Sequence, residues 1–137
     1  MTDFSQKALD ALLERAGTVA QNSYSPYSGF KVGAALQLSN GEIVTGTNVE
    51  NVSYGATICA ERAALVEAVS RFGPTIRVLA VAVANLNQAA SPPCGACRQM
   101  LAEFTESNAP VAFPASDRVR VMAFADLMPL ATEMKLK

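Results

Sequence analysis

The stretch RVLAVAVAN, residues 77–85, decides the fold class of this chain. It places apolar residues on both faces of an extended strand, which is typical of a strand at the centre of a sheet with helices on both sides. It stands between two segments of helical character, ICAERAALVEAVSRFG (residues 58–73) and CGACRQMLAEFTES (residues 94–107). The first of these ends at a glycine that is followed by proline, a common stop signal. This order predicts an α/β domain.

Residues 30–49 predict a hairpin. FKVGAALQL (residues 30–38) alternates strictly and places Phe30 on the same face as four further apolar residues. Asn40-Gly41 is a strong turn signal, and EIVTGTNV (residues 42–49) is the returning strand.

Residues 3–23 have the three- and four-residue spacing of an amphipathic helix. The positions that carry this spacing are Phe4, Ala8, Leu12, Ala16 and Val19. Short strands are predicted at residues 110–113 and 118–124, and a short last helix at 125–134. The order α-β-β-α-β-α-β-β-α predicts a three-layer α-β-α architecture with a mixed five-stranded sheet, and residues 1–137 form a single domain.

Composition and charge narrow the classes of partner. Of the 137 residues, 50% are hydrophobic and 17% are charged, the net charge is −1, and there is no basic run. A polynucleotide partner requires Lys and Arg to neutralise phosphates, so we expect no nucleic acid. No apolar run approaches the ~20 residues of a membrane span, so no membrane is expected. The N-terminus lacks an export signal and the cysteine count is odd, which predicts a cytoplasmic protein.

All three cysteines lie at the starts of two predicted helices, and the chain has no histidine. Cys94 and Cys97 are three residues apart and share one helix face, while Cys59 begins the other helix. The partial positive charge of each helix start favours thiolate over thiol. This arrangement suits a zinc ion held by three thiolates, with the fourth position left for water as in catalytic sites. Glu61 is then a candidate proton carrier.

These residues also allow other interpretations. A C-x-x-C pair alone fits a thioredoxin-like redox pair or two buried thiols. Cys59 could also complete a structural zinc site with Glu61 as the fourth ligand. The catalytic interpretation is favoured by CAE at residues 59–61 followed by PCGAC at residues 93–97. C-x-E followed by P-C-x-x-C is the signature of zinc-dependent deaminases.

The sequence closely resembles the small homotetrameric cytidine deaminases over nearly its whole length. SPYSGFKVGAAL (residues 25–36) resembles the first loop and strand of that family. GTNVENVSYGATICAERAAL (residues 46–65) resembles its substrate loop and first zinc helix, and SPPCGACRQ (residues 91–99) its second zinc motif. The resemblance implies one Zn²⁺ per subunit, a homotetramer and a nucleoside substrate. The implied reaction is hydrolytic deamination of cytidine and 2′-deoxycytidine with release of ammonia, as in pyrimidine salvage.

The resemblance also implies the roles of the catalytic group. Cys59, Cys94 and Cys97 would hold the metal, and Glu61 would move protons from water to ring N3 and to the leaving amine. Because three thiolates leave the zinc site with a net negative charge, Arg62 is expected to offset it by bonding to the ligand sulfurs. Arg98, in contrast, is expected to face solvent.

Five further residues are assigned to the substrate by the resemblance. Phe30 would lie against the pyrimidine, Asn48 and Glu50 would bind the ribose hydroxyls, Ala60 would line the site, and Tyr54 would reach a neighbouring subunit's site. From the residues alone, Phe30 fits core packing, Asn48 a turn, and Glu50 and Tyr54 an ordinary surface.

One segment departs from the family pattern. Where the family ends in L-P-x-x-aromatic, this chain has MPLAT at residues 128–132, so Thr132 replaces an aromatic that helps to close an adjoining site. That closure therefore cannot be carried over to this chain.

Three alternative functions are weighed against cytidine deamination. A deaminase of another aminopyrimidine or of an aminonucleoside antibiotic is disfavoured by the N-x-E string, which suits a ribosyl substrate. A structural zinc module predicts that a change at Glu61 is tolerated. A thiol redox protein predicts a zinc-free chain with a reversible Cys94–Cys97 disulfide.

Overall fold

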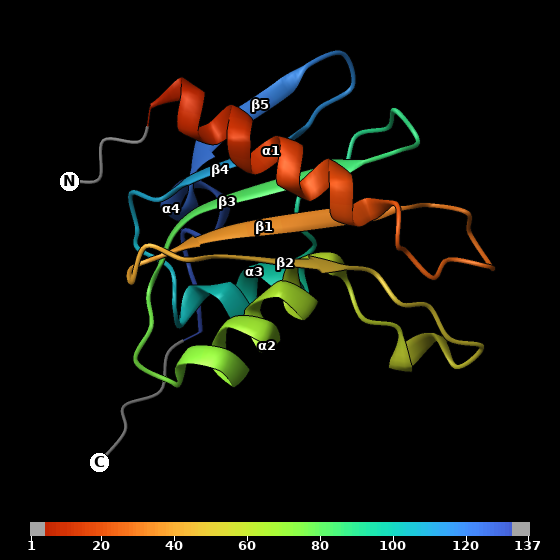
Figure 1. The fold of residues 1–137 in the computed structure, drawn as a ribbon, viewed down its shortest axis with the longest axis horizontal. Coiled ribbons are helices and arrows are strands. Elements are labelled where there is room, and N and C mark those ends of the chain that lie inside the picture. Colours follow the sequence, from red (N-terminus) through yellow and green to blue (C-terminus); the bar gives the residue numbers. More distant parts are fainter. Residues whose placement is uncertain (1–4, 133–137) are drawn as a thin grey trace.

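A computed structural model describes residues 5–132 of the chain. The central strand is β3 (Val78–Asn85), the middle strand of a five-stranded sheet with the order β2-β1-β3-β4-β5 (Figure 1). The other strands are β1 (Val32–Leu38), β2 (Ile43–Thr47), β4 (Pro110–Pro114) and β5 (Val119–Ala123). Only the β3–β4 pair is parallel, so the sheet is mixed, as predicted.

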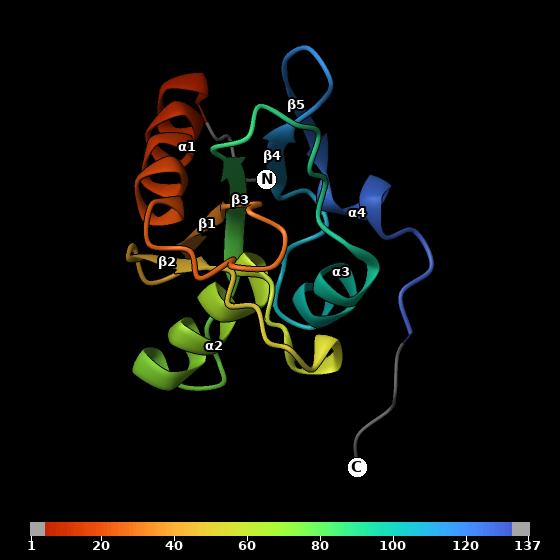
Figure 2. The same cartoon turned by 90° about the vertical axis from the view of Figure 1, so that its right-hand side faces the viewer.

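Helices cover both faces of the sheet. α1 (Gln6–Ala20) lies on one face, and α2 (Ala60–Phe72) and α3 (Gly95–Ala102) lie side by side on the other (Figures 1 and 2). A short 3-10 helix (Tyr54–Ala56) precedes α2, and α4 (Phe124–Leu127) follows β5. The three-layer prediction is therefore confirmed. None of the helices within residues 5–132 is long and apolar enough to cross a membrane.

Small and large residues alternate along β3 and separate two cores. Ala80 and Ala82 face α1 and pack with Leu12 of that helix, while Val81 and Val83 belong to the larger core on the opposite face, under α2 and α3. Both faces of β3 are fully buried over this stretch. The sequence feature that predicted a central strand thus corresponds to two different packing surfaces.

Two glycines let helices rest directly on the sheet backbone. A Cβ atom on Gly33 would lie 1.9 Å from the Ala16 carbonyl oxygen of α1. A Cβ atom on Gly46 would lie 2.3 Å from the Ala64 nitrogen and 2.7 Å from the Ala60 oxygen of α2. Ala60 is the first residue of α2. The lack of a side chain at Gly46 therefore allows the start of this helix to lie close to the backbone of β2.

The buried face of α1 differs in part from the prediction. It consists of Leu9, Leu12, Ala16 and Ala20. Of the predicted positions, Leu12 and Ala16 are therefore buried, Ala8 and Val19 are half-buried, and Phe4 lies outside the described residues.

The last two helices are shorter than predicted. α3 ends at Ala102 because the chain turns back to the sheet, where Phe104 O accepts a hydrogen bond from Val78 N at 2.8 Å. α4 ends at Leu127, two residues before Pro129, which has no N–H and disfavours a helical residue before it. The last residues of the predicted final helix lie outside the described part of the chain.

We expect Gly46→Ala to lower the free energy of unfolding by about 1–3 kcal/mol, because the added methyl group overpacks the contact between β2 and α2. The matched control is Gly17→Ala in α1, where an added Cβ meets nothing within 4 Å. This change should leave stability unchanged or raise it by up to about 1 kcal/mol. Denaturant unfolding measures both. Equal stability of Gly46→Ala and the original chain would show that α2 does not rest on this backbone.

Candidate functional site

Three sulfur atoms meet where α2 and α3 begin. Cys59 is the N-cap of α2, Cys94 is the N-cap of α3, and Cys97 lies in the first turn of α3. The Sγ atoms of Cys59 and Cys94 are 3.9 Å apart, those of Cys94 and Cys97 are 3.3 Å apart, and all three lie within 4.8 Å of one another. The partial positive charges of two helix starts therefore act on one sulfur cluster.

This sulfur spacing fits a zinc ion. Zn–S bonds of about 2.3 Å at tetrahedral angles place sulfur atoms about 3.8 Å apart, whereas a disulfide requires about 2.05 Å. The two hydrogen-bonded sulfur pairs, at 3.3 and 3.9 Å, lie near the zinc value. Within residues 5–132, these cysteines are the one group of at least three His, Cys, Asp or Glu side chains close enough to share a metal ion. The donor set suits zinc, since thiolates are among its preferred ligands.

The thiols and a nearby arginine already favour a negative charge at this point. The neighbouring thiol of Cys97 and the guanidinium of Arg62 lower the pKa of the Cys59 thiol to about 5. The proximity of Cys59 and burial raise the pKa of the Cys97 thiol. Nη2 of Arg62 lies 3.7 Å from Cys59 Sγ and donates to the Thr57 carbonyl at 3.2 Å. Its Nε is buried without a hydrogen-bond partner among the described residues.

Glu61 is a carboxyl group in an apolar setting. Its residue is 5% exposed in the first turn of α2, and burial is the main cause that raises its pKa to about 7. The negative charge of the adjacent Cys59 thiolate raises the pKa of Glu61 further, and the positive charge of Arg62 lowers it. A carboxyl group with such a pKa can both accept and release a proton near neutral pH.

A cavity of about 190 Å³ opens onto the sulfur cluster. Of the predicted residues, six line it: Phe30, Asn48, Cys59, Ala60, Glu61 and Cys94. Its walls also include the apolar residues Val32, Val83 and Pro92. The structure thus brings two of the three predicted metal ligands, the acid and the aromatic to one small cavity with apolar sides, while the third ligand, Cys97, is fully buried in the sulfur cluster.

Asn48 is engaged with the protein itself. Its Oδ1 accepts hydrogen bonds from Val32 N at 3.0 Å and from Ser23 Oγ at 2.6 Å, and its Nδ2 donates to Phe30 O at 2.8 Å. The residue is 8% exposed. An amide has two donors and one carbonyl oxygen, so one N–H is left for another partner.

Glu50 and Tyr54 lie in a neighbouring cavity of about 400 Å³, which shares Thr57 with the smaller one. The carboxylate of Glu50 accepts hydrogen bonds from Tyr27 N at 3.0 Å, from Ser28 N at 3.2 Å and from Ser28 Oγ. The Ser28 hydroxyl is the main cause that holds the pKa of Glu50 below its usual value. Tyr54 is 80% exposed on the 3-10 helix.

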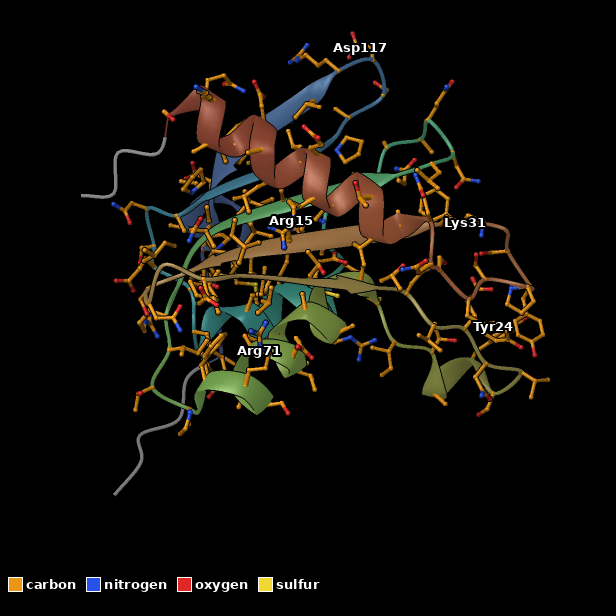
Figure 3. All side chains as sticks on the ribbon, viewed as in Figure 1. Arg15, Tyr24, Lys31, Arg71 and Asp117 are labelled. Atoms are coloured by element: carbon orange, nitrogen blue, oxygen red, sulfur yellow. The ribbon has the colours of Figure 1, made fainter. Side chains whose placement is uncertain are left out.

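The loops that carry both cavities are joined by backbone hydrogen bonds. Val49 and Ile58 exchange two bonds of 2.9 Å, which fix the chain directly before Cys59. Glu50 N donates to Tyr24 O at 2.8 Å, so the loop after α1 is tied to the loop after β2. Tyr24 and Lys31 mark this end of the molecule in Figure 3.

Sequence reasoning missed several residues of the site. Thr57 lies in the lining of both cavities, and Ser91 and Pro92 line the smaller one. The signal for Ser91 and Pro92 was present, since both precede Cys94 in the same motif. The prediction for Arg98 was wrong, because its side chain is bonded to Pro93 O and Leu127 O and not directed to solvent.

Comparison with known proteins gives matches over most of the chain. Residues 6–112 match the family model described as the cytidine and deoxycytidylate deaminase zinc-binding region. A cytidine deaminase of Halalkalibacterium halodurans is 44% identical over 100 residues, which cover 73% of this chain and 74% of that protein. A cytidine deaminase of Mycobacterium tuberculosis is 43% identical over 114 residues, with 83% and 81% covered.

Solved structures agree with these matches. The crystal structure of cytidine deaminase from Mycobacterium tuberculosis aligns with a TM-score of 0.80 and 40% identity, covering 91% of this chain and 97% of that chain. The cytidine deaminase from Burkholderia pseudomallei aligns with a TM-score of 0.80 and 41% identity, covering 90% and 98%.

Proposed function

The chain belongs to the cytidine and deoxycytidylate deaminase family, and we propose that it converts cytidine and 2′-deoxycytidine to uridine and deoxyuridine by hydrolysis, with one zinc ion per subunit. The observation that carries this proposal is a cluster of three thiols, two of which, Cys59 and Cys94, line one small cavity together with the buried Glu61. Water is consumed and ammonia is released, so no further reactant is needed.

Cys59, Cys94 and Cys97 would hold the zinc ion, which, when bound, lowers the pKa of a water molecule. Three thiolates on Zn²⁺ leave a net charge of −1, which weakens this effect. Two features of the chain offset that charge. Arg62 lies beside Cys59 Sγ, and the positive ends of α2 and α3 point to the sulfurs.

Glu61 would carry the protons of the reaction. It lies in the lining of the cavity, two residues from a metal ligand, and burial keeps its proton affinity high. In the proposed reaction, Glu61 accepts a proton from the attacking water, delivers it to ring N3, and later carries a proton to the leaving amine. The low exposure of Glu61 also excludes competing solvent, which strengthens its hydrogen bonds to substrate.

The pyrimidine ring would lie between the apolar walls, with Phe30 against it. Asn48 would hold the sugar with its remaining amide N–H, while its other groups fix the backbone of Phe30 and Val32. Glu50 accepts three hydrogen bonds in the structure, and a carboxylate has about four acceptor sites. One site is therefore left for a ribose hydroxyl. Ala60 completes the lining beside Glu61.

We also propose a cytoplasmic homotetramer that acts in pyrimidine salvage, with Tyr54 reaching a neighbouring subunit's site. Support comes from the high exposure of Val52, at 77%, and of Tyr54, at 80%. An apolar groove between α2 and α3, which includes Val66 and Met100, gives further support. Closed symmetric homo-oligomers are the common form of soluble assemblies. Sedimentation at micromolar concentration should give four subunits, and a monomer would contradict this proposal.

Glu61→Gln should separate catalysis from metal binding. We expect this variant to keep one zinc ion per chain and its fold, and to lose activity on the order of 10²–10⁴-fold, because only the proton carrier is removed. Cys97→Ser should lose zinc and stability together, since metal binding is linked to folding. The matched control is Glu67→Gln on the exposed face of α2, which should leave both unchanged. Zinc analysis and an absorbance assay with cytidine measure these outcomes, and near-full activity of Glu61→Gln would contradict the proton role.

The free nucleoside should be preferred over its 5′-phosphate. The site already holds a negative sulfur cluster, Glu61 and Glu50, so a phosphate group meets like charges. The measurement is the ratio of kcat/KM for cytidine and for cytidine 5′-monophosphate. Glu50→Gln should narrow the preference for cytidine over its 5′-monophosphate, because it removes one negative charge from the site. Added salt should narrow it as well, because Glu50 is accessible to screening ions. The control is Glu42→Gln on the distant hairpin turn, and equal kcat/KM values in the original chain would refute the charge argument.

A further inference from the structure

The backbone before the metal ligand Cys94 has few hydrogen-bonding groups of its own. Pro92 and Pro93 lack N–H groups, so between Ser91 and Cys94 the backbone can form hydrogen bonds only through its carbonyl oxygens, although the Pro93 ring is fully buried. Ser91 anchors the beginning, since its N–H donates to Pro114 O at 3.0 Å and its hydroxyl accepts from Asn85 Nδ2 at 3.0 Å. Between Ser91 and Cys94, a partner for the free carbonyls has to come from elsewhere in the chain.

Arg98 supplies that partner. Its Nε donates to Pro93 O at 2.7 Å, and its backbone N–H donates to Cys94 O at 2.9 Å. These two carbonyls belong to the peptide groups on either side of the Cys94 Cα atom. The two flanking peptide planes determine the direction of the Cα–Cβ bond of Cys94. The first backbone bond of α3 holds one plane, as it would with any residue other than proline at position 98, and the Arg98 side chain holds the other plane through Pro93 O.

The guanidinium of Arg98 is itself held by α4, a short helix packed on the larger core. Its Nη1 donates to Leu127 O at 3.1 Å, an end carbonyl of α4 without a partner inside that helix. α4 is anchored by Phe124 and Leu127, which are 5% and 8% exposed in the larger core. Phe124 N also donates to Ala109 O at 2.8 Å. Arg98 thus joins the ligand segment to an element packed in the core.

Of the three cysteines, Cys94 has the greatest need of such support. Cys97 is fully buried, and Cys59 is flanked by the Val49–Ile58 backbone pair and by Arg62. Cys94 is exposed, so packing alone does not fix its position.

We propose that Arg98 is a positioning residue for the metal ligand Cys94, and that α4 supports the metal site through it. This inference rests on the zinc site of the proposed function. A lysine cannot replace Arg98 fully, because one ammonium group lacks the rigid planar fork that reaches Pro93 O and Leu127 O together. Loss of residues that orient a metal ligand typically weakens metal binding 10–100-fold.

The test measures the transfer of zinc from the loaded, folded protein to a chromogenic chelator, beside thermal unfolding of the same samples. We expect Arg98→Met to release zinc about 10–100-fold faster than the original chain. Arg98→Lys should release zinc at an intermediate rate. Because this variant keeps the positive charge, it also serves as the test if Arg98→Met does not fold.

Two controls separate positioning from general stability. Arg77→Met removes another structural arginine, which bonds Glu106 and Glu103 O and makes no described contact to residues 91–97. Gln99 lies on the same helix as Arg98, and Gln99→Ala removes its side-chain hydrogen bonds to the Thr132 backbone. Both should release zinc at the rate of the original chain even where the unfolding temperature falls.

The outcomes distinguish this inference from the proposed function. Zinc release at the original rate in both Arg98 variants would overturn the role of Arg98 while leaving the zinc site intact. Equally fast release from Arg77→Met and Arg98→Met would also overturn it, because the effect would then be general destabilisation. An original chain that binds no zinc would overturn the metal site and this inference together.

Discussion

Two helices that begin at the same point create the conditions on which the site depends. β2 and β3 are both antiparallel to β1, so they run in the same direction. Their C-terminal ends therefore both lie beside the start of β1. α2 follows β2 and α3 follows β3, and both helices pack on the same face (Figure 2). Their N-termini therefore meet, and residues at the two helix starts share one positive electrostatic environment. Cys59 and Cys94 occupy the two N-cap positions, so the topology brings them together.

The absence of histidine makes these helix starts more important. An all-thiolate ligand set carries more negative charge than one that includes a neutral imidazole, and burying that charge is costly unless it is compensated. The helix ends and Arg62 supply the compensation on one side of the cluster, while apolar residues form the walls of the cavity. The same apolar setting raises the pKa of Glu61. The protein thus stabilises anionic sulfur and a protonatable carboxyl group within one helical turn.

The sequence was informative where a pattern repeats or a motif has fixed spacing. The alternating Val and Ala of residues 77–85 correctly predicted the central strand, and the helix starts at Cys59 and Cys94 follow from local signals. Bonds from side chains to distant backbone groups leave no such pattern. The contact of Arg98 with Leu127 O spans 29 residues, and that of Asn48 with Val32 N spans 16. The early end of α3 depends in the same way on a pairing with β3 that only the folded sheet provides.

The proposed reaction requires a small apolar space for the chemistry and accessible polar groups for the sugar. The two neighbouring cavities would meet these two requirements separately. Chemistry at a ring carbon benefits from a small, water-poor space in which electrostatic interactions are strong. Recognition of the polar sugar of the proposed substrate needs accessible donors and acceptors, which Glu50 and Asn51 would offer in the larger cavity. The side chains of Glu50 and Asn48 are already ordered by hydrogen bonds within the loops after α1 and β2, so under the proposed function a substrate would meet groups that have lost their conformational freedom before binding. Under the proposed function, the hydrogen bonds that hold these two side chains would also prepare them for the substrate, and loop order and substrate affinity should change together when either residue is altered.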